Sequence, residues 1–224
     1  MESNRELDLL YQGEQLTRDF QGKASPEVIA IMKRAAEELR NSGIAATAVR
    51  AGEKAPDFTL PNAVGRPYHL ADGLGRGPVV VTFYRGAWCP YCNLQLKMYQ
   101  KILRQIHATG ASLVAISPQT PDQSQAMLLH NYLEYEVLSD LGNRVGRAYG
   151  LVYPLNREMR QLYLDFGIDL SRYNGDDSWE IPLPGTFVVA QDAVIRLAFV
   201  EPDYRKRLQP AVLLAVLQKM AAAG

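Results

Sequence analysis

The sequence predicts an α/β fold in which a central mixed sheet is flanked by helices and preceded by an N-terminal helical extension. Three observations carry this prediction. Residues 79–84 are a run of apolar and β-branched residues, which is typical of a strand buried on both faces. A helical pattern and a second buried run at 111–117 follow it at the spacing of a parallel crossover. Residues 186–190 and 194–200 are joined by a tight turn, so these two strands are expected to be antiparallel.

The composition is that of an ordinary soluble globular protein. The chain has 224 residues, 47% of them hydrophobic, and carries 24 basic and 24 acidic side chains, so one substantial core can form. Zero net charge gives no indication of nucleic-acid binding. No run of about eighteen apolar residues is present and the polar N-terminus does not resemble a signal peptide, so we expect a cytoplasmic protein without a membrane segment.

Residues 1–50 are predicted to form a helical extension, and residues 51–224 a single domain. The extension has a first helix at about residues 5–20 and a second that begins with Ser25 as N-cap and Pro26 at the first helical position. The apolar stripe of the second helix comprises Val28, Ile31, Met32, Ala35 and Leu39. Because these residue types suggest no chemistry, we expect the extension to pack, either by capping the core or by making a homodimer contact.

The rest of the chain alternates short strands and helices. Residues 58–60 and 68–70 flank a turn rich in Pro, Asn and Gly, which predicts a β-hairpin. After the crossover we expect a helix at 121–133, a strand at 137–138 and a brief helix at 143–149. A further helix at 156–166 has an apolar stripe of Met159, Leu162, Tyr163 and Phe166, and a closing helix begins at 210.

The two cysteines of the chain, Cys89 and Cys92, lie where the buried strand meets a helix. An apolar pattern at spacings of three and four follows Cys92. The unpaired N–H groups of a first helical turn favour an anion, and a Cys-x-x-Cys motif at such a place can lower a thiol pKa from about 8.5 to roughly 7 or below. A spacing of three also allows the sulfurs to close a disulfide. The sequence therefore predicts a redox-active dithiol that is partly ionised at neutral pH.

Three other interpretations of the cysteines are less favoured. Inert buried cysteines are common, but chance rarely places the only two of a chain at this spacing behind Trp88 and a buried strand. Zinc needs about four ligands, and His69, His107 and His130 do not have paired ligand spacing, so no metal or other cofactor is expected. A permanent disulfide would close so small a ring that it would contribute little stability.

In its order of elements the chain resembles a thioredoxin fold, and within that superfamily it resembles the peroxiredoxins of the alkyl hydroperoxide reductase and thiol-specific antioxidant group. The resemblance runs from Gly52 to the C-terminus. Four short motifs carry it in the expected order, namely Gly52–Leu60, Phe83-Tyr84, Leu138-Ser139-Asp140 with Val145–Leu151, and Gly185–Val189. Known peroxiredoxin-like proteins also share the loop Phe-Tyr-Arg-Gly-x-Trp-Cys-Pro-x-Cys.

The active loops depart from the peroxiredoxin pattern Pro-x-x-x-Thr-x-x-Cys. Aligning on Phe-Tyr puts the peroxidatic cysteine on Cys92, the threonine on Cys89 and the proline on Arg85, so the hydroxyl that positions the peroxide is missing. Pro184 stands where that family has its activating arginine, and thioredoxins have a cis-proline there that faces the dithiol. Trp88 and the Cys-Pro-Tyr-Cys motif are also thioredoxin-like.

The resemblance implies a thiol-dependent peroxidase, an antioxidant oxidoreductase that reduces hydrogen peroxide or organic hydroperoxides and is reset by thioredoxin or another external dithiol. One cysteine would be oxidised to a sulfenic acid and its neighbour would resolve it to a disulfide. Positive charge would be needed at the developing oxyanion. Arg85 is the first candidate for that charge, and Arg205 and Arg207 are weaker candidates that also fit a solvated surface.

The sequence leaves alternatives for the identity of the reactive cysteine and for the function of the pair. The helix position and the thioredoxin comparison favour Cys89, expected to be the more exposed cysteine, as the reactive thiolate, whereas the peroxiredoxin alignment favours Cys92; we favour Cys89. The function also has alternatives. Trp88, the two cysteines and Pro184 are compatible with a thioredoxin-like disulfide oxidoreductase, and a non-catalytic redox sensor would use the same pair.

Overall fold

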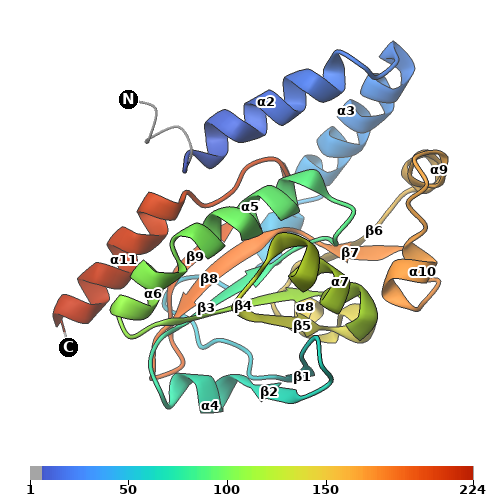
Figure 1. Cartoon of the computed structure of the whole chain (residues 1–224). Helices are drawn as coiled ribbons and strands as arrows, with labels where there is room; N and C mark the ends of the chain where they lie inside the picture. Colours follow the sequence, from blue (N-terminus) through green and yellow to red (C-terminus); the bar gives the residue numbers. More distant parts are fainter. Residues whose placement is uncertain (1–6, 224) are drawn as a thin grey trace.

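A five-stranded mixed sheet lies at the centre of the molecule, between layers of helices (Figure 1). The computed structural model describes residues 7–223. In spatial order the strands are β5 (Glu136–Ser139), β4 (Ser112–Ser117), β3 (Val79–Phe83), β8 (Gly185–Val189) and β9 (Ile195–Val200). The first three are parallel to one another, and β8 is antiparallel to both β3 and β9. This topology confirms the predicted parallel crossover, the antiparallel hairpin and the thioredoxin-like order.

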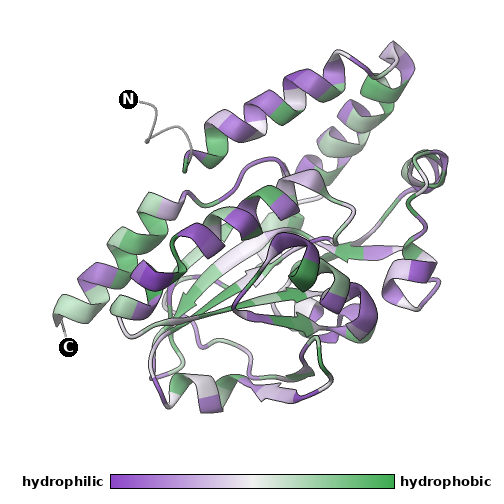
Figure 2. Ribbon diagram, in the orientation of Figure 1, coloured by the Kyte–Doolittle hydropathy of each residue, from purple (hydrophilic) through white to green (hydrophobic). Residues whose placement is uncertain are grey.

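The central strand β3 is buried along its whole length, as its apolar run predicted. Its side chains alternate between two clusters. Val80 packs with residues of the helices on one face, such as Leu96 and Ile106. Val81 and Phe83 pack on the opposite face. Apolar residues accordingly colour the sheet strands in Figure 2, and the strand delivers residues 85–92 to the edge of the core.

The predicted helices begin and end close to the expected positions, except that the helix after Cys92 is divided at Ile102, and α4 and α10 were not predicted. The helices beyond the first two are α4 (Leu70–Leu74), α5 (Pro90–Lys101), α6 (Leu103–Ala108), α7 (Pro121–Asn131), α8 (Arg144–Ala148), α9 (Arg157–Asp165), α10 (Leu170–Asn174) and α11 (Pro210–Ala223), with short 3-10 turns at Ile44–Thr47 and Leu141–Asn143. None of the helices within residues 7–223 is both long and apolar enough to cross a membrane.

Two small antiparallel sheets lie beside the central one. The predicted hairpin is confirmed as β1 (Thr59–Pro61) with β2 (Pro67–His69). A second pair, β6 (Val152–Pro154) with β7 (Glu180–Pro182), was not predicted. Each of its strands has only three residues and ends in proline, which leaves too short a pattern to recognise. Along the chain α9 and α10 lie between these two strands, and in space they lie beyond the end of the pair (Figure 1).

The N-terminal extension forms two helices that cap the core. They are α2 (Leu9–Gln21) and α3 (Pro26–Asn41), and the predicted N-cap is confirmed because Val28 N donates to the Ser25 hydroxyl. The predicted start of the first helix at residue 5 lies outside the described residues. In the structure α2 packs against α5, and α3 packs against α9 (Figure 1). Capping was one of the two predicted uses of the extension, and the homodimer contact stays a prediction.

Candidate active site

Cys89 and Cys92 lie where β3 passes into α5. Cys89 is the N-cap residue of that helix and Cys92 lies in its first turn, as the motif predicted. Both are reduced and buried, with exposed fractions of 1% and 0%. The expected greater exposure of Cys89 therefore amounts to 1%, and neither thiol is open to solvent in this conformation. Leu9 and Leu16 of α2 and Tyr204 of the loop after β9 join the apolar cluster that contains both cysteines.

The two thiols differ in pKa. Burial raises the pKa of Cys89, and its hydrogen bond to Cys92 and the negative charge there raise it further. Burial raises the pKa of Cys92 as well, but the hydrogen bond from Cys89, the positive charges of Arg207 and Arg85, and the Arg85 backbone N–H together lower it to about 5. These directions favour Cys92 as the ionised cysteine, whereas the sequence favoured Cys89.

Two arginines donate to the sulfur of Cys92. The backbone N–H of Arg85 donates to Sγ at 3.4 Å, and Nη2 of Arg207 donates at 3.5 Å. The chain can present the Arg85 N–H because Gly86 turns with φ of 152°, and a Cβ at Gly86 would lie 2.3 Å from the Trp88 ring. Of the two weaker candidates from the sequence, it is Arg207 that reaches the sulfur.

Arg205 points elsewhere, because its guanidinium pairs with Asp203 through two contacts of 2.8 Å. Its neighbour Arg207 is far more enclosed, with an exposed fraction of 9%. A buried cation keeps most of its electrostatic effect on a nearby thiolate, whereas an exposed pair is screened by water.

The side chain of Arg85 lies among three aromatic rings and is itself buried. Its guanidinium carbon is 4.2 Å from the ring centre of Tyr204, 5.0 Å from that of Trp88 and 6.0 Å from that of Tyr163. Nη2 of Arg85 also donates to the Tyr163 hydroxyl. Such cation–π contacts favour a desolvated cation, so this cage holds a positive charge beside both cysteines.

The cage is assembled from three segments of the chain. Tyr163 comes from α9, Trp88 from the loop after β3 and Tyr204 from the loop after β9. Trp88 and Tyr163 pack edge to face with their ring centres 5.1 Å apart. The half-buried Trp88 also belongs to the apolar cluster in which the α3 stripe packs on α9. The extension therefore supports the cage from outside.

A second set of contacts ties α2 to the same place. The Thr17 hydroxyl is 2.8 Å from the hydroxyl of Tyr91, the residue before Cys92. The ring of Tyr91 packs edge to face on Tyr204 at 5.5 Å. Tyr91 and Tyr204 also line a cavity of about 370 Å³ that opens between α2 and α3. The rings of Tyr91 and Tyr204 therefore separate this cavity from the apolar cluster that contains the two cysteines.

Gln119 holds the active loop from the side of β4. It follows the carboxyl end of that strand, is fully buried, and its Oε1 accepts a hydrogen bond from Ala87 N at 2.8 Å. Nδ2 of Asn93 donates to the carbonyl of the same alanine at 2.6 Å. The loop between the strand and the helix is therefore fixed through both backbone groups of Ala87.

Several buried N–H groups around the site have no partner among the described residues. They are Nε of Arg85, Nε1 of Trp88, Nε2 of Gln119 and Nε of Arg207. Because buried polar groups are normally paired, each of these donors is available to an oxygen acceptor.

Pro184 is buried, but every peptide bond within residues 7–223 is trans. Pro184 therefore does not have the cis peptide bond of the thioredoxin proline to which it was compared. Beyond Pro184 the strand contributes Thr186, whose hydroxyl lies 3.0 Å from that of Thr82 and accepts from Gln95 at 3.2 Å. These contacts anchor β8 to β3 and α5.

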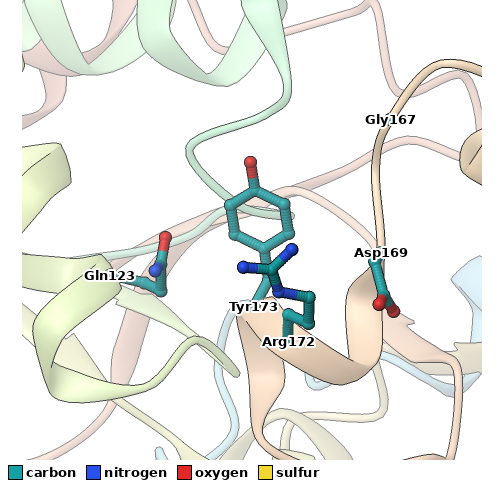
Figure 3. Close-up of a pocket in the computed structure, with 5 residues that line it drawn as sticks. All are labelled: Gln123, Gly167, Asp169, Arg172 and Tyr173. Carbon is teal, nitrogen blue, oxygen red and sulfur yellow. The ribbon is translucent and has the colours of Figure 1, made fainter.

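Elsewhere the structure offers little that competes with the dithiol. A pocket of about 190 Å³ lies between α7 and α10, where Tyr173 stands between Gln123 and Asp169 (Figure 3). None of the side chains around the cysteines lines it. No cluster of three or more metal-binding side chains occurs among the described residues.

Sequence reasoning named Arg85, Trp88, Cys89 and Cys92, and the structure brings these four together. It missed Gln119, Tyr163 and Tyr204 and ranked Arg207 low. Tyr163 belongs to the predicted apolar stripe of its helix, which signals packing and nothing more. Gln119 and Tyr204 have no motif around them that could have identified them.

A model of the AhpC/TSA family matches residues 51–198. A putative peroxiredoxin of Mycobacterium tuberculosis is 36% identical over 104 residues, which cover 46% of this chain and 66% of that protein. The chloroplastic peroxiredoxin Q of Sedum lineare is 33% identical over 113 residues, which cover 50% of this chain and 60% of that protein. The match therefore spans slightly less than two thirds of these relatives.

Solved structures share the thioredoxin-like fold. The peroxidoxin BcpB of Mycobacterium tuberculosis superposes with a TM-score of 0.61 and 22% identity, over 77% of this chain and 98% of that one. The reduced 2-Cys peroxiredoxin of Plasmodium vivax gives a TM-score of 0.60 and 14% identity, over 78% and 98%. Helices α2 and α3, Tyr204 and Arg207 all lie outside the family match.

Proposed function

Because the chain belongs to the AhpC/TSA family, we propose that it is a thiol-dependent peroxidase that reduces hydrogen peroxide or organic hydroperoxides, with Cys92 as the attacking thiolate. The observation that carries the proposal is the Cys92 sulfur, which accepts from Arg85 N at 3.4 Å and from Arg207 Nη2 at 3.5 Å. A thiolate is the nucleophilic form of cysteine, and these donors and charges lower the pKa of this buried thiol. Cys89 is then the resolving cysteine, which reverses our preference from the sequence.

In the first step the Cys92 thiolate attacks one oxygen of the hydroperoxide. An S–O bond forms, the O–O bond breaks, and the departing alkoxide or hydroxide takes up a proton to give an alcohol or water. Cys92 becomes a sulfenic acid and the peroxide is reduced by two electrons. Negative charge moves from sulfur to oxygen during this step, and the fixed cations Arg85 and Arg207 beside the sulfur suit that displacement.

In the second step Cys89 attacks the sulfur of the sulfenic acid. An S–S bond forms and the hydroxyl leaves as water with the thiol proton. The negative charge on Cys92, which raises the pKa of Cys89 in the reduced protein, is gone after the first step. Cys89 therefore becomes easier to ionise when it is needed. An external dithiol such as thioredoxin would then reduce the disulfide and itself be oxidised.

The attack on the hydroperoxide and the final reduction by an external dithiol both require access to sulfurs that are closed off in this conformation. The cavity between α2 and α3 ends at Tyr91 and Tyr204, so a movement of Tyr204 would join it to the space around Arg85. We propose this route for the hydroperoxide. Lids that close over reacting groups commonly open on the timescale of turnover.

A disulfide oxidoreductase is the second candidate, supported by Trp88 and the Cys-Pro-Tyr-Cys sequence. The trans peptide bond before Pro184 and the raised pKa of Cys89 count against it. The redox sensor differs from both in predicting oxidation without turnover. A homodimer and a cytoplasmic location are kept as sequence-based proposals that gel filtration and cell fractionation would test.

The proposal is tested by peroxide consumption with thioredoxin or dithiothreitol as reductant. We expect Cys92→Ser to abolish turnover, and Cys89→Ser to reduce peroxide once and to leave a sulfenic acid on Cys92 that a dimedone label captures. If the wild-type protein consumes peroxide no faster than the double serine variant, the peroxidase proposal fails. Turnover of an insulin disulfide by that same inactive preparation would support the second candidate instead.

A further inference from the structure

The two donors on the Cys92 sulfur leave the departing oxygen of the hydroperoxide without a hydrogen-bond donor. Arg85 N and Arg207 Nη2 both point at Sγ, where they stabilise the thiolate. When the O–O bond breaks, however, charge develops on the departing oxygen, and a fixed N–H group directed at that oxygen would speed the step. Such a donor should be buried, rigid and unpaired in the structure without substrate.

Gln119 fits this description. Its carboxamide is fully buried and is anchored at one end, because Oε1 accepts the Ala87 N–H at 2.8 Å. A backbone N–H can only donate, so the oxygen of the amide must face it and the NH₂ group must face away. That NH₂ has no partner among residues 7–223. The orientation of the amide is thus set by the loop and leaves a donor free.

Two further donors of the loop that Gln119 anchors bear on what this donor would bind. Arg85 Nε and Trp88 Nε1 are also buried without partners in the described part of the chain, and both belong to the loop that Gln119 anchors. The unpaired side-chain groups of this loop are thus N–H donors. A ligand that satisfies them must offer oxygen lone pairs and no obligatory positive charge, which describes a hydroperoxide.

We propose that Gln119 is a catalytic residue that donates a hydrogen bond from Nε2 to the hydroperoxide, at the oxygen that departs. This proposal rests on the peroxidase function proposed above. The same side chain holds the loop through Ala87, so its two roles must be separated experimentally. They can be, because each role uses a different end of the amide.

Two substitutions at Gln119 separate the role of the amide oxygen from that of the amide NH₂ group. Gln119→Glu keeps an oxygen for the Ala87 N–H and replaces the donor with a second acceptor, whereas Gln119→Met removes both in a side chain of similar length. The same change at the exposed Gln105 on α6, Gln105→Glu, is the matched control. Reduced proteins are mixed with hydrogen peroxide in a stopped-flow instrument, and the rate constant is divided by that for alkylation of Cys92 by iodoacetamide.

Alkylation reports the thiolate without any O–O cleavage, so this ratio isolates what the protein does for the peroxide. We expect the ratio to fall at least about tenfold in both Gln119 variants, and to be unchanged in the control. For Gln119→Glu we expect the ratio to recover as the pH is lowered, because the introduced carboxyl regains an O–H donor when it is protonated.

A ratio that stays at the wild-type value in Gln119→Glu would overturn the proposal. If Gln119→Met alone lowered it, Gln119 would only be anchoring the loop. Failure of the peroxidase proposal is recognised separately, because wild-type protein would then react with iodoacetamide and not with peroxide.

Discussion

The space around the dithiol has an inner wall and an outer cover, and the two have different origins. The inner wall is formed by residues 85–92 and Gln119, which follow the central strands. The outer cover is formed by α2, α3 and the loop 201–209. The inner wall lies within the family match at 51–198 and the outer cover lies outside it. Both sulfurs therefore lie within the matched residues, whereas Arg207, Tyr204 and the two helices that cover the sulfurs lie outside them.

The two regions are also held differently. The inner wall is fixed through the backbone, since Ala87 is bonded at both its N–H and its carbonyl. The outer cover meets the site through side chains, namely the Thr17 hydroxyl, the ring of Tyr204 and the guanidinium of Arg207. Side-chain contacts can break without unfolding a strand, so we expect the outer cover to be the part that opens.

The largest expected effect concerns Arg207 of the outer cover. Arg207→Met keeps the apolar stem and removes the charge that lowers the pKa of Cys92. Without it that pKa rises, so the thiolate is lost at a higher pH as acid is added. In the wild type the loss occurs only as the pH falls through about 5. We expect peroxide reduction at pH 7 to fall about a hundredfold, as followed by stopped-flow rates against pH.

Arg205→Met is the matched control for that variant, since Arg205 is in the same loop and pairs with Asp203 instead of the sulfur. We expect it to leave the acid limb of the pH profile where it is. An equal shift in both variants would mean that the general charge of the loop matters and that the 3.5 Å contact of Arg207 with Cys92 does not.

A smaller effect is expected at the junction of the two regions. Tyr163→Phe removes the hydroxyl that accepts from Arg85 and keeps the ring that packs on Trp88. A buried charged donor then loses a partner, so unfolding free energy should fall by about 1–3 kcal/mol. The peroxide rate should fall roughly tenfold, because the cation is held less firmly. Urea denaturation and stopped-flow kinetics measure the two effects.

Tyr173→Phe is the control for this substitution, because Tyr173 lies in the separate pocket between α7 and α10 (Figure 3). We expect it to change neither quantity. If Tyr163→Phe lowered stability and left the peroxide rate intact, Arg85 would be a structural cation of the cage with no part in the reaction.

The inner wall could be predicted from the sequence much more fully than the outer cover. A buried apolar run, a helix start and the Cys-x-x-Cys spacing are local signals, and they placed β3, α5 and both cysteines. The choice of thiolate depends on Arg207, which is 115 residues from Cys92 along the chain. No local pattern encodes such a contact. The prediction from the sequence compared the two thiols only by their positions in the first turn of the helix. In the structure, the contact with the distant side chain of Arg207 distinguishes them.

The outer cover was predicted only as packing, for a physical reason. The stripe Val28, Ile31, Met32 and Ala35 specifies that α3 buries one face, and it does not specify what lies underneath. Tyr163 likewise served as a stripe residue of α9. That these two stripes meet over Trp88 follows from the short β6 and β7 pair, whose strands were too brief to recognise.

The smallest expected effect tests whether the outer cover moves. Thr17→Val removes the 2.8 Å contact between α2 and Tyr91 with little change in shape, at a cost of about 0.5–1.5 kcal/mol. If α2 must separate from Tyr91 before reagents reach the dithiol, the loss of this contact raises the population of the open form. Cys92 is then alkylated a few times faster at an unchanged pKa.

Thr109→Val is the control, because it removes only a local bond to Ile106 at the end of α6, and it should leave the alkylation rate unchanged. Equal rates in Thr17→Val and wild type would show that access arises within the inner wall, through Trp88, and that the helices of the extension stay closed during turnover.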